Sequence, residues 1–572
     1  MNYLKNVYKK SYRDQDKIIT PEETVLHAKQ QLKKLDLDIL QETRRIDNNR
    51  LGIPVFFSIY GADAQKLTGK RKQMGKGADS AQAEASAIME LVERFSLYDF
   101  MHQDSSFKKV PLQNMKDPTI PFAQIAQSVH DRVDESSVEY QFFSDLPLRW
   151  TRAFDLKNND WTCIPFDWFF QINAYNGSSA GNCMEEAIIQ GMSEVIERHA
   201  CDLIIRQQKP TRKINLETVS DPVACSLIQR FLQAGVELHV YDYSLDTGIP
   251  VLGGIAWDPS TFPSSSEIVW TAGAMPDPAR SLSRVLTEIA QLGGDFNTGS
   301  SYEPSGLPKL TSVQDIEKIH GNCPIIPFSE LPDLSDDNIK TEIMNYQSAL
   351  SKILPNIYVV DVTHSGLCLP SCYTIMPGAC FRERAVNASV GLFTAKLMTS
   401  IFAPDIALKK LSDFDHALPG QYYIPFFQGT ILLQQSENKK ALDYFSTALS
   451  NSPDGEDLCD IYVHIGMCEK NMANYFQAIS ALNQADVIDP CRTDVLNLLG
   501  VCYYQINQYA SAIDCFERLI QIDPGSAMDY ANLGINYKAL EKNNKAREYL
   551  EKAVTLDPGI TFAWEHLMEL SV

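Results

Sequence analysis

Several features that would place this chain in a common class are missing from its sequence. No apolar run approaches the roughly 20 residues that a membrane-spanning helix requires. The charged N-terminal stretch is not followed by the apolar stretch of a secretory signal. Positive charge is scarce, because 72 Asp and Glu oppose 51 Lys and Arg, a formal charge of −21. Since such a chain repels a phosphate backbone, the sequence argues against nucleic acid and membranes as partners.

Paired cysteines and the common nucleotide motifs are missing too. The 13 cysteines are odd in number and irregular in spacing, which is typical of reduced thiols and predicts a cytoplasmic protein. Neither Gly-x4-Gly-Lys-Ser/Thr nor Gly-x-Gly-x2-Gly occurs, which argues against a P-loop enzyme and a dinucleotide-binding protein. The 572 residues exceed the roughly 250–300 residues of a single core, so more than one domain is expected.

A sequence repeat fills the C-terminal quarter, residues 421–572. Each repeat carries a glycine, then an alanine, a large apolar residue, another small or apolar residue and a proline. The last three repeats follow one another every 34 residues. The matched positions are Gly429, Ala441, Phe445, Ala448 and Pro453; Gly466, Ala478, Leu482, Ala485 and Pro490; Gly500, Ala512, Phe516, Leu519 and Pro524; and Gly534, Ala546, Leu550, Ala553 and Pro558. Small residues here let two antiparallel helices approach closely, and proline ends the second helix.

This repeat resembles the tetratricopeptide (TPR) pattern. The resemblance predicts an all-α TPR solenoid over 421–572, closed by a capping helix within 559–572. Residues 405–420 are expected to form a linker, because they end in Pro419-Gly420. Since a TPR array has no chemistry of its own, this domain is expected to bind a protein or peptide.

Residues 1–404 alternate extended and helical patterns, which predicts a mixed α/β (α+β) domain. Three of its expected helices carry polar residues on one face. These residues are Ser86, Glu90 and Glu93 in the first helix; Asn182, Glu186, Glu194 and Glu197 in the second; and Arg284, Glu288 and Gln291 in the third. Expected strands lie at 53–59, 251–257 and 357–362, and the helices at 81–100, 183–206 and 278–293.

Carboxylates at one-turn spacing repel one another unless a cation lies between them. Each face alone is better explained as a solvated surface neutralised by a neighbouring arginine. Taken together, and with Glu-x2-Glu-Arg repeated in the first two helices, the three faces predict a shared site for Mg²⁺ and phosphates.

The order and spacing of these residues resemble the YcaO superfamily over most of residues 18–400. The stretches Gly75-Lys-Gly77 and 176–182, ahead of the first two helices, match as well. The resemblance implies ATP and Mg²⁺ as cofactors and the ATP-dependent activation of a peptide backbone amide; it assigns no catalytic residue. It implies a nucleotide site made of Lys76, Ser86, Glu90, Glu93, Asn182, Glu186, Glu194, Glu197, Arg284 and Glu288, in which the glutamates Glu90, Glu93, Glu186, Glu194, Glu197 and Glu288 hold the metal.

The resemblance leaves the reaction open. Azoline-forming members often end in a proline-rich tail that is not found here, and the stretches 20–24 and 47–55 are similar to members that act with a TfuA partner in thioamide formation. We therefore expect thioamide formation on a peptide or protein substrate. The expected protein partner is a TfuA-like or sulfur-delivering protein. The TPR repeats are expected to bind the substrate or this partner. A homodimer is expected as well. Azoline-forming cyclodehydration, an accessory role in ribosomal protein methylthiolation and a non-catalytic TPR scaffold are the alternatives.

Overall fold

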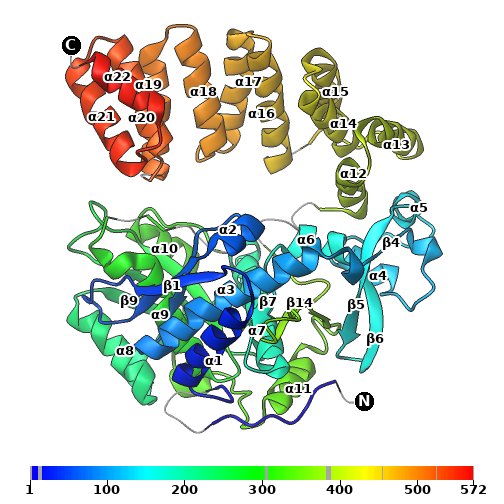
Figure 1. Ribbon diagram of the computed structural model, residues 1–572, viewed down its shortest axis with the longest axis vertical. Coiled ribbons are helices and arrows are strands. Elements are labelled where there is room, and N and C mark those ends of the chain that lie inside the picture. The colour runs from blue at the N-terminus through cyan, green and yellow to red at the C-terminus, as the bar shows by residue number, and fades with distance from the viewer. Residues whose placement is uncertain are drawn as a thin grey trace. The chain divides into compact units, whose positions relative to one another are not determined.

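The computed structural model describes residues 3–10, 16–299, 301–302, 307–381, 388–453, 455–523 and 525–570. The chain divides into two compact units, Met1–Val390 and Gly391–Val572 (Figure 1). Each unit is described by itself. Pro524, expected to close the third repeat, lies outside the described residues.

The boundary between the units differs from the one expected at residues 404 and 405. Helix α12 (Val390–Ile401) is followed by α13 (Pro404–Ala417), which occupies most of the expected linker. The buried side chains of α13 are apolar, and the helix packs on α14 (Tyr423–Gln434). Most of residues 405–420 therefore form an additional helix of the second unit, because their apolar positions recur at helical spacing.

The N-terminal unit contains a small antiparallel sheet in the order β1-β2-β3. Helix α3 packs on β2 and β3, and α1 packs on α3. The elements are α1 (Pro21–Lys34), β1 (Leu40–Arg45), β2 (Val55–Tyr60), α2 (Ala62–Thr68), β3 (Lys72–Lys76) and α3 (Ser80–His102). A Cβ at Gly75 would lie 2.0 Å from the backbone nitrogen of Ala87, so glycine is what lets β3 approach α3.

A second sheet has the order β11-β10-β9-β8-β12, in which only the pairing of β12 with β8 is parallel. Its core is apolar side chains from the strands and from helices α8 and α9. The elements are β8 (Arg212–Asn215), α8 (Pro222–Gln233), β9 (Glu237–Asp242), β10 (Val251–Trp257), β11 (Val269–Ala274), α9 (Pro278–Gly293), α10 (Val313–His320) and β12 (Ile325–Pro327).

A third, antiparallel sheet has the order β4-β5-β13-β14-β7, with β6 paired to β5. Its elements are β4 (Lys108–Val110), α4 (Phe122–Gln127), α5 (Val138–Ser144), β5 (Leu148–Asp155), β6 (Asp160–Pro165), α6 (Phe166–Asn173), β7 (Ser178–Ala180), α7 (Met184–Gln207), α11 (Ile339–Leu350), β13 (Tyr358–Asp361) and β14 (Ser371–Ile375). Short 3₁₀ helices lie at Asp104–Ser106, Leu112–Asn114, Leu216–Thr218, Gly294–Phe296 and Phe328–Glu330.

The three sheets bring α3, α7 and α9 together. Helices α3 and α7 both contact β7 and β14 of the third sheet, α7 also contacts β11, and α9 contacts β10, β11 and β3. The expected strands are β2, β10 and β13, and the expected helices are α3, α7 and α9. The mixed fold predicted for this domain is confirmed.

The second unit is an array of paired helices, which follow one another side by side in Figure 1. After α14 come α15 (Asn438–Ser450), α16 (Gly455–Asn471), α17 (Tyr475–Ile488), α18 (Thr493–Gln505), α19 (Tyr509–Ile522), α20 (Ala527–Ala539), α21 (Asn543–Leu556) and α22 (Thr561–Glu569). A Cβ on any of the four repeat glycines would lie 2.5–2.7 Å from the large apolar side chain of the paired helix. The predicted close approach is confirmed, and α22 is the expected capping helix.

All 13 cysteines are free. Within the described ranges, no helix combines the length and the apolar character needed to cross a membrane.

Candidate nucleotide and metal site

Helix α3 brings two glutamates and an arginine to one face. The helix begins after Asp79, whose carboxylate accepts a backbone N–H of the first turn. Arg94 Nη1 lies 3.2 Å from Glu93 Oε1, and its Nη2 lies 3.8 Å from Glu90 Oε1. Ser178 of β7 donates its hydroxyl to Glu93. The repulsion between the two glutamates is thus offset by a cation from the same helix.

Helix α7 repeats this arrangement. Arg198 Nη2 lies 4.0 Å from Glu194 Oε1, and its Nη1 lies 3.6 Å from Glu197 Oε1. At the start of the helix, the backbone and side-chain nitrogens of Asn182 donate to Glu186 Oε2 at 2.8 and 3.0 Å. The Glu-x2-Glu-Arg echo in the sequence therefore has a structural counterpart.

Helix α9 adds positive charge to these carboxylates. Asp277 caps the helix by accepting the N–H of Ala279 at 2.7 Å. Two turns later, Arg284 Nε lies 3.4 Å from Glu197 Oε2 of α7. Glu288 forms an ion pair with Lys76, the last residue of β3. The interaction of Lys76 shows that it is held by the fold and is not a solvated loop residue.

One cavity of about 620 Å³ collects these side chains. It is lined by all ten residues that the sequence assigned to the site, namely Lys76, Ser86, Glu90, Glu93, Asn182, Glu186, Glu194, Glu197, Arg284 and Glu288. The arginines Arg94 and Arg198 and the third-helix Gln291 line it as well. The expected convergence of three helix faces is observed; the ligand that each residue binds stays a prediction.

The sequence did not reveal that the N-terminal segment also lines this cavity. Asp16 and Lys17 lie on its wall, and the backbone N–H of Ile18 donates to Glu186 Oε1 at 2.6 Å. Burial alone would lower the pKa of Lys17, but the carboxylates of Asp16 and Glu186 raise it overall. No periodic pattern links this segment to helices so distant in sequence, so no signal in the sequence pointed to Lys17. Several polar residues of the helices were missed too, among them Gln190 and Arg280.

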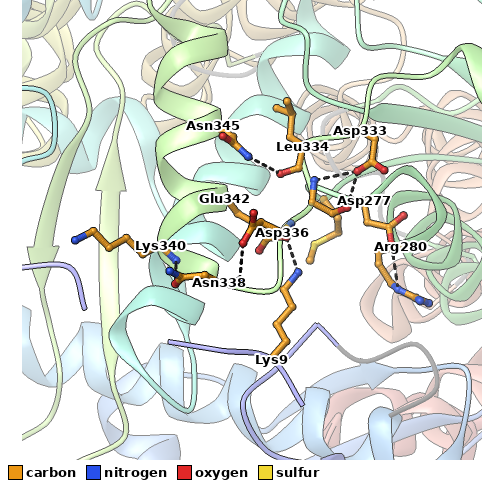
Figure 2. A network of polar contacts seen from close by, with 12 residues as sticks. Lys9, Asp277, Arg280, Asp333, Leu334, Asp336, Asn338, Lys340, Glu342 and Asn345 are labelled. Carbon is orange, nitrogen blue, oxygen red and sulfur yellow. Dashed lines mark hydrogen bonds and ion pairs between the residues drawn. The ribbon is translucent and has the colours of Figure 1, made fainter. Parts of the chain in front are cut away.

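A network of polar contacts anchors the N-terminal segment beside α11. Figure 2 shows Lys9 paired with Glu342, whose Oε1 also accepts the N–H of Asp336 at 3.2 Å. The N–H of Val7 donates to Asn338 Oδ1 at 3.1 Å. Burial raises the pKa of Glu342 to about 7 even though Lys9 opposes the rise. The segment that reaches the cavity is therefore attached to the fold at a buried ion pair.

The crowded charges shift the pKa values of the cavity residues. Burial raises the pKa of Glu93 to about 8, and the carboxylates of Glu194 and Glu90 add to the rise. Burial also raises the pKa of Glu194. In the opposite sense, burial and the nearby Arg284 lower the pKa of Lys76 to about 8. Perturbed pKa values of this kind concentrate at functional sites.

The cavity residues suit a bound cation and its phosphates. Asn182 Oδ1, Glu197 Oε2 and Gln291 Oε1 are buried oxygens that accept no hydrogen bond from the described residues. Carboxylate and amide oxygens are the ligands that Mg²⁺ takes from proteins. Among the described residues, no three His, Cys, Asp or Glu side chains are already gathered as a formed metal cluster. Glu90, Glu93, Glu194 and Glu197 instead lie beside arginines, so a bound cation would replace an arginine as the group that offsets their charge.

Comparisons with known proteins agree with this site. A family model described as YcaO cyclodehydratase, ATP- and Mg²⁺-binding, matches residues 74–380, and two tetratricopeptide-repeat models match residues 493–526 and 530–560. An uncharacterized protein of Methanothermobacter thermautotrophicus is 28% identical and covers 63% of this chain and 94% of its own length. An uncharacterized protein in the tfuA 3′ region of Rhizobium leguminosarum bv. trifolii is 24% identical and covers 55% of this chain and 76% of its own.

A solved structure described as a heterocyclase in complex with substrate and cofactor has a similar fold. Its TM-score is 0.53 at 21% identity, and the likeness covers 66% of this chain and 54% of that one. The family match covers more than half of the 572 residues and includes α3, α7 and α9. The chain therefore belongs to the YcaO family, which binds ATP and Mg²⁺, and carries TPR repeats in its C-terminal unit.

Proposed function

We propose that this protein uses ATP and Mg²⁺ to activate a backbone amide of a peptide or protein substrate, and that the product is a thioamide. The observation that carries the proposal is the convergence of α3, α7 and α9 on one cavity, where six glutamates and several basic side chains meet. A triphosphate and its metal require both signs of charge in one place. The family match, described as ATP- and Mg²⁺-binding, supports the same ligands.

The roles of the chain's residues follow from their charge. The six glutamates are proposed to hold Mg²⁺, and Lys76, Arg284 and Lys17 to lie against the phosphates. When bound, ATP supplies the phosphoryl group, and Mg²⁺ supplies the positive charge that offsets the triphosphate. Asn182, whose two nitrogens both donate to Glu186, fixes the orientation of that carboxylate.

The proposed reaction exchanges an oxygen for a sulfur. An amide oxygen is a poor leaving group, so its departure must be coupled to phosphate release. Overall, the amide, ATP and hydrosulfide give the thioamide, ADP and phosphate. The carbon–oxygen bond breaks, a carbon–sulfur bond forms, and the amide oxygen leaves within the phosphate. The relative encoded in a tfuA 3′ region supports this branch of the family.

Cyclodehydration is the second candidate, and the description of the family match as a cyclodehydratase favours it. In that reaction a neighbouring Cys, Ser or Thr side chain of the substrate closes a ring, and the amide oxygen leaves as phosphate in the same way. The TPR unit serves either reaction by holding the substrate or a sulfur-delivering partner, because tethering raises the effective concentration near the cavity.

Calorimetry of ATP and Mg²⁺ binding tests the site. Glu194→Gln/Glu197→Gln should abolish binding that the wild-type protein shows. Glu185→Gln is the matched control, because Glu185 is buried on the same helix but lies outside the cavity lining, where it accepts the N–H of Lys5. Absence of binding by the wild-type protein would contradict the proposal and favour a scaffold. Mass spectrometry of the product distinguishes the two reactions, because thioamide formation replaces an oxygen by a sulfur and cyclodehydration removes a water.

A further inference from the structure

The stretch between Asp63 and Asp79 has an unusual charge for this chain. It contains no Asp or Glu, although acidic residues outnumber basic ones in the sequence as a whole. Four of its cations are exposed at the end of α2 and the start of β3, and we call them the cationic tip: Lys66, Lys70, Arg71 and Lys72. Across the described ranges, none of the four forms an ion pair with a carboxylate.

Among the described residues, the nearby carboxylates of Asp38 and Asp63 bind backbone N–H groups and form no ion pair with the cationic tip. Asp63 Oδ2 accepts the N–H of Asp38 at 2.8 Å, and Asp38 Oδ2 accepts the N–H of Ala62 at 2.8 Å. The ammonium of Lys72 lies 4.1 Å from the centre of the Phe57 ring. The positive charge of the tip is thus available to a ligand.

The β1-β2-β3 sheet has one covered face and one open face. On the covered face, Gly75 packs against α3 and Gln73 donates to Glu90 of that helix. The alternate residues point the other way. There Phe57 pairs with Met74, Ile59 lies beside them, and all three side chains stay half-buried. We call Phe57, Ile59 and Met74 the open face.

Strand β3 links the cationic tip to the candidate site. It begins at Lys72 in the tip and ends at Lys76 on the cavity wall. At about 3.3 Å per residue, the two positions are about 13 Å apart along the strand. A polypeptide bound at the tip would therefore lie about 13 Å along the strand from the cavity wall.

We propose that the cationic tip and the open face dock an acidic segment of the polypeptide substrate that also carries apolar side chains, away from the amide that reacts. The inference rests on the proposed function. The charge of the tip selects an acidic partner, and the half-buried apolar side chains select a protein over a purely charged polymer. A long nucleic acid is disfavoured by the formal charge of −21.

The test uses the full chain and a fluorescein-labelled peptide of alternating glutamate and valine. Fluorescence anisotropy at low salt should show binding that Lys70→Glu/Arg71→Glu/Lys72→Glu weakens by about tenfold or more. The matched control, Lys109→Glu/Lys116→Glu/Lys157→Glu, changes the net charge equally at exposed lysines elsewhere and should stay within about twofold. Phe57→Ser/Met74→Ser should weaken binding while leaving the tip intact.

Three results would overturn the inference. The first is equal peptide binding by the tip variant and the control. The second is tighter binding of an oligothymidylate than of the peptide at the same salt. The third is conversion of a dimer to a monomer by the tip variant in analytical ultracentrifugation, which would assign the face to a second copy. Binding of ATP and Mg²⁺, measured on the same samples, separates failure of this inference from failure of the proposed function.

Discussion

Glu93 carries a stability penalty that should be measurable in the metal-free protein. Its pKa is about 8 in the folded chain and ordinarily 4.5. Between these pH values the folded chain holds a proton that the unfolded chain has released, so stability falls as the pH rises through this window. Glu93→Gln should raise the free energy of unfolding at pH 8 by about 1–3 kcal/mol. This is less than the free energy that corresponds to the full pKa shift, because Arg94 loses an ionic partner in the variant. Urea unfolding at pH 5 and pH 8 checks this, and an equal gain at both would contradict it.

The same pKa predicts proton release on metal binding. At pH 7 Glu93 is mostly protonated, whereas a divalent cation binds the ionised carboxylate, so binding must expel the proton. Calorimetry with preformed Mg–ATP in two buffers of different ionisation enthalpy should show a release of about one proton that Glu93→Gln lacks. The release should fade at pH 9. Equal release by wild type and variant would remove Glu93 from the metal site.

The sequence predicted many of the cavity residues that lie on α3, α7 and α9, because helical periodicity fixes which side chains share a face, but it missed others such as Gln190 and Arg280. The spacing of Glu194 and Glu197 placed them on one helix face, and the family resemblance assigned that face to the nucleotide site. Lys17 could not, because it reaches the cavity from a segment with no regular pattern and is held there by contacts distant in sequence. The ion pair of Lys76 with Glu288 could not be predicted from the sequence either, since it joins a strand to a helix.

At the scale of elements, the buried ion pair of Lys9 with Glu342 is one of the contacts that hold the N-terminal segment. The side chains of Lys9 and Glu342 are 12% and 2% exposed, whereas those of the neighbouring pair Lys10 and Glu23 are 45% and 50% exposed. Lys9→Met should cost about 2–4 kcal/mol, since it leaves Glu342 buried without its cation, and Lys10→Met about 0–1 kcal/mol. Hydrogen exchange of residues 3–10 reports the difference. Equal exchange in the two variants would show that the pair does not hold the segment.

A loosened segment should also weaken nucleotide binding. Asp16 and Lys17 of the same segment lie on the cavity wall, and the N–H of Ile18 donates to Glu186. We therefore expect Lys9→Met, but not Lys10→Met, to raise the dissociation constant for Mg–ATP several-fold.

Figure 2 shows a further link in which Leu334 lies in the same network as Asp277 and Arg280 at the start of α9. No sequence pattern predicts these links, because each joins an irregular segment to a helix.

For the whole molecule, the two units should respond separately to mutation. A Cβ at Gly500 would lie 2.6 Å from the ring of Phe516, whereas one at the loop residue Gly525 would come no closer than 3.3 Å to another atom. Gly500→Ala should destabilise the repeat unit by about 1–3 kcal/mol, and Gly525→Ala much less. Calorimetric unfolding should show that only the transition of the repeat unit moves. Loss of Mg–ATP binding in Gly500→Ala would contradict independent units.

The boundary between the units decides which truncation retains nucleotide binding. Removing residues 421–572 takes away α14 and exposes the buried apolar side chains of α13, Ala407, Leu411 and Phe414. Removing 391–572 takes α13 away as well, so the apolar face of α13 is not exposed. We expect the shorter chain to stay monodisperse in size-exclusion chromatography and to bind Mg–ATP within about twofold of the full protein. The chain ending at residue 420 should aggregate because its exposed helix face is apolar. If both truncated chains eluted in the same way from the size-exclusion column, α13 would belong to neither core. If the shorter chain lost Mg–ATP binding, part of the nucleotide site would lie beyond residue 390.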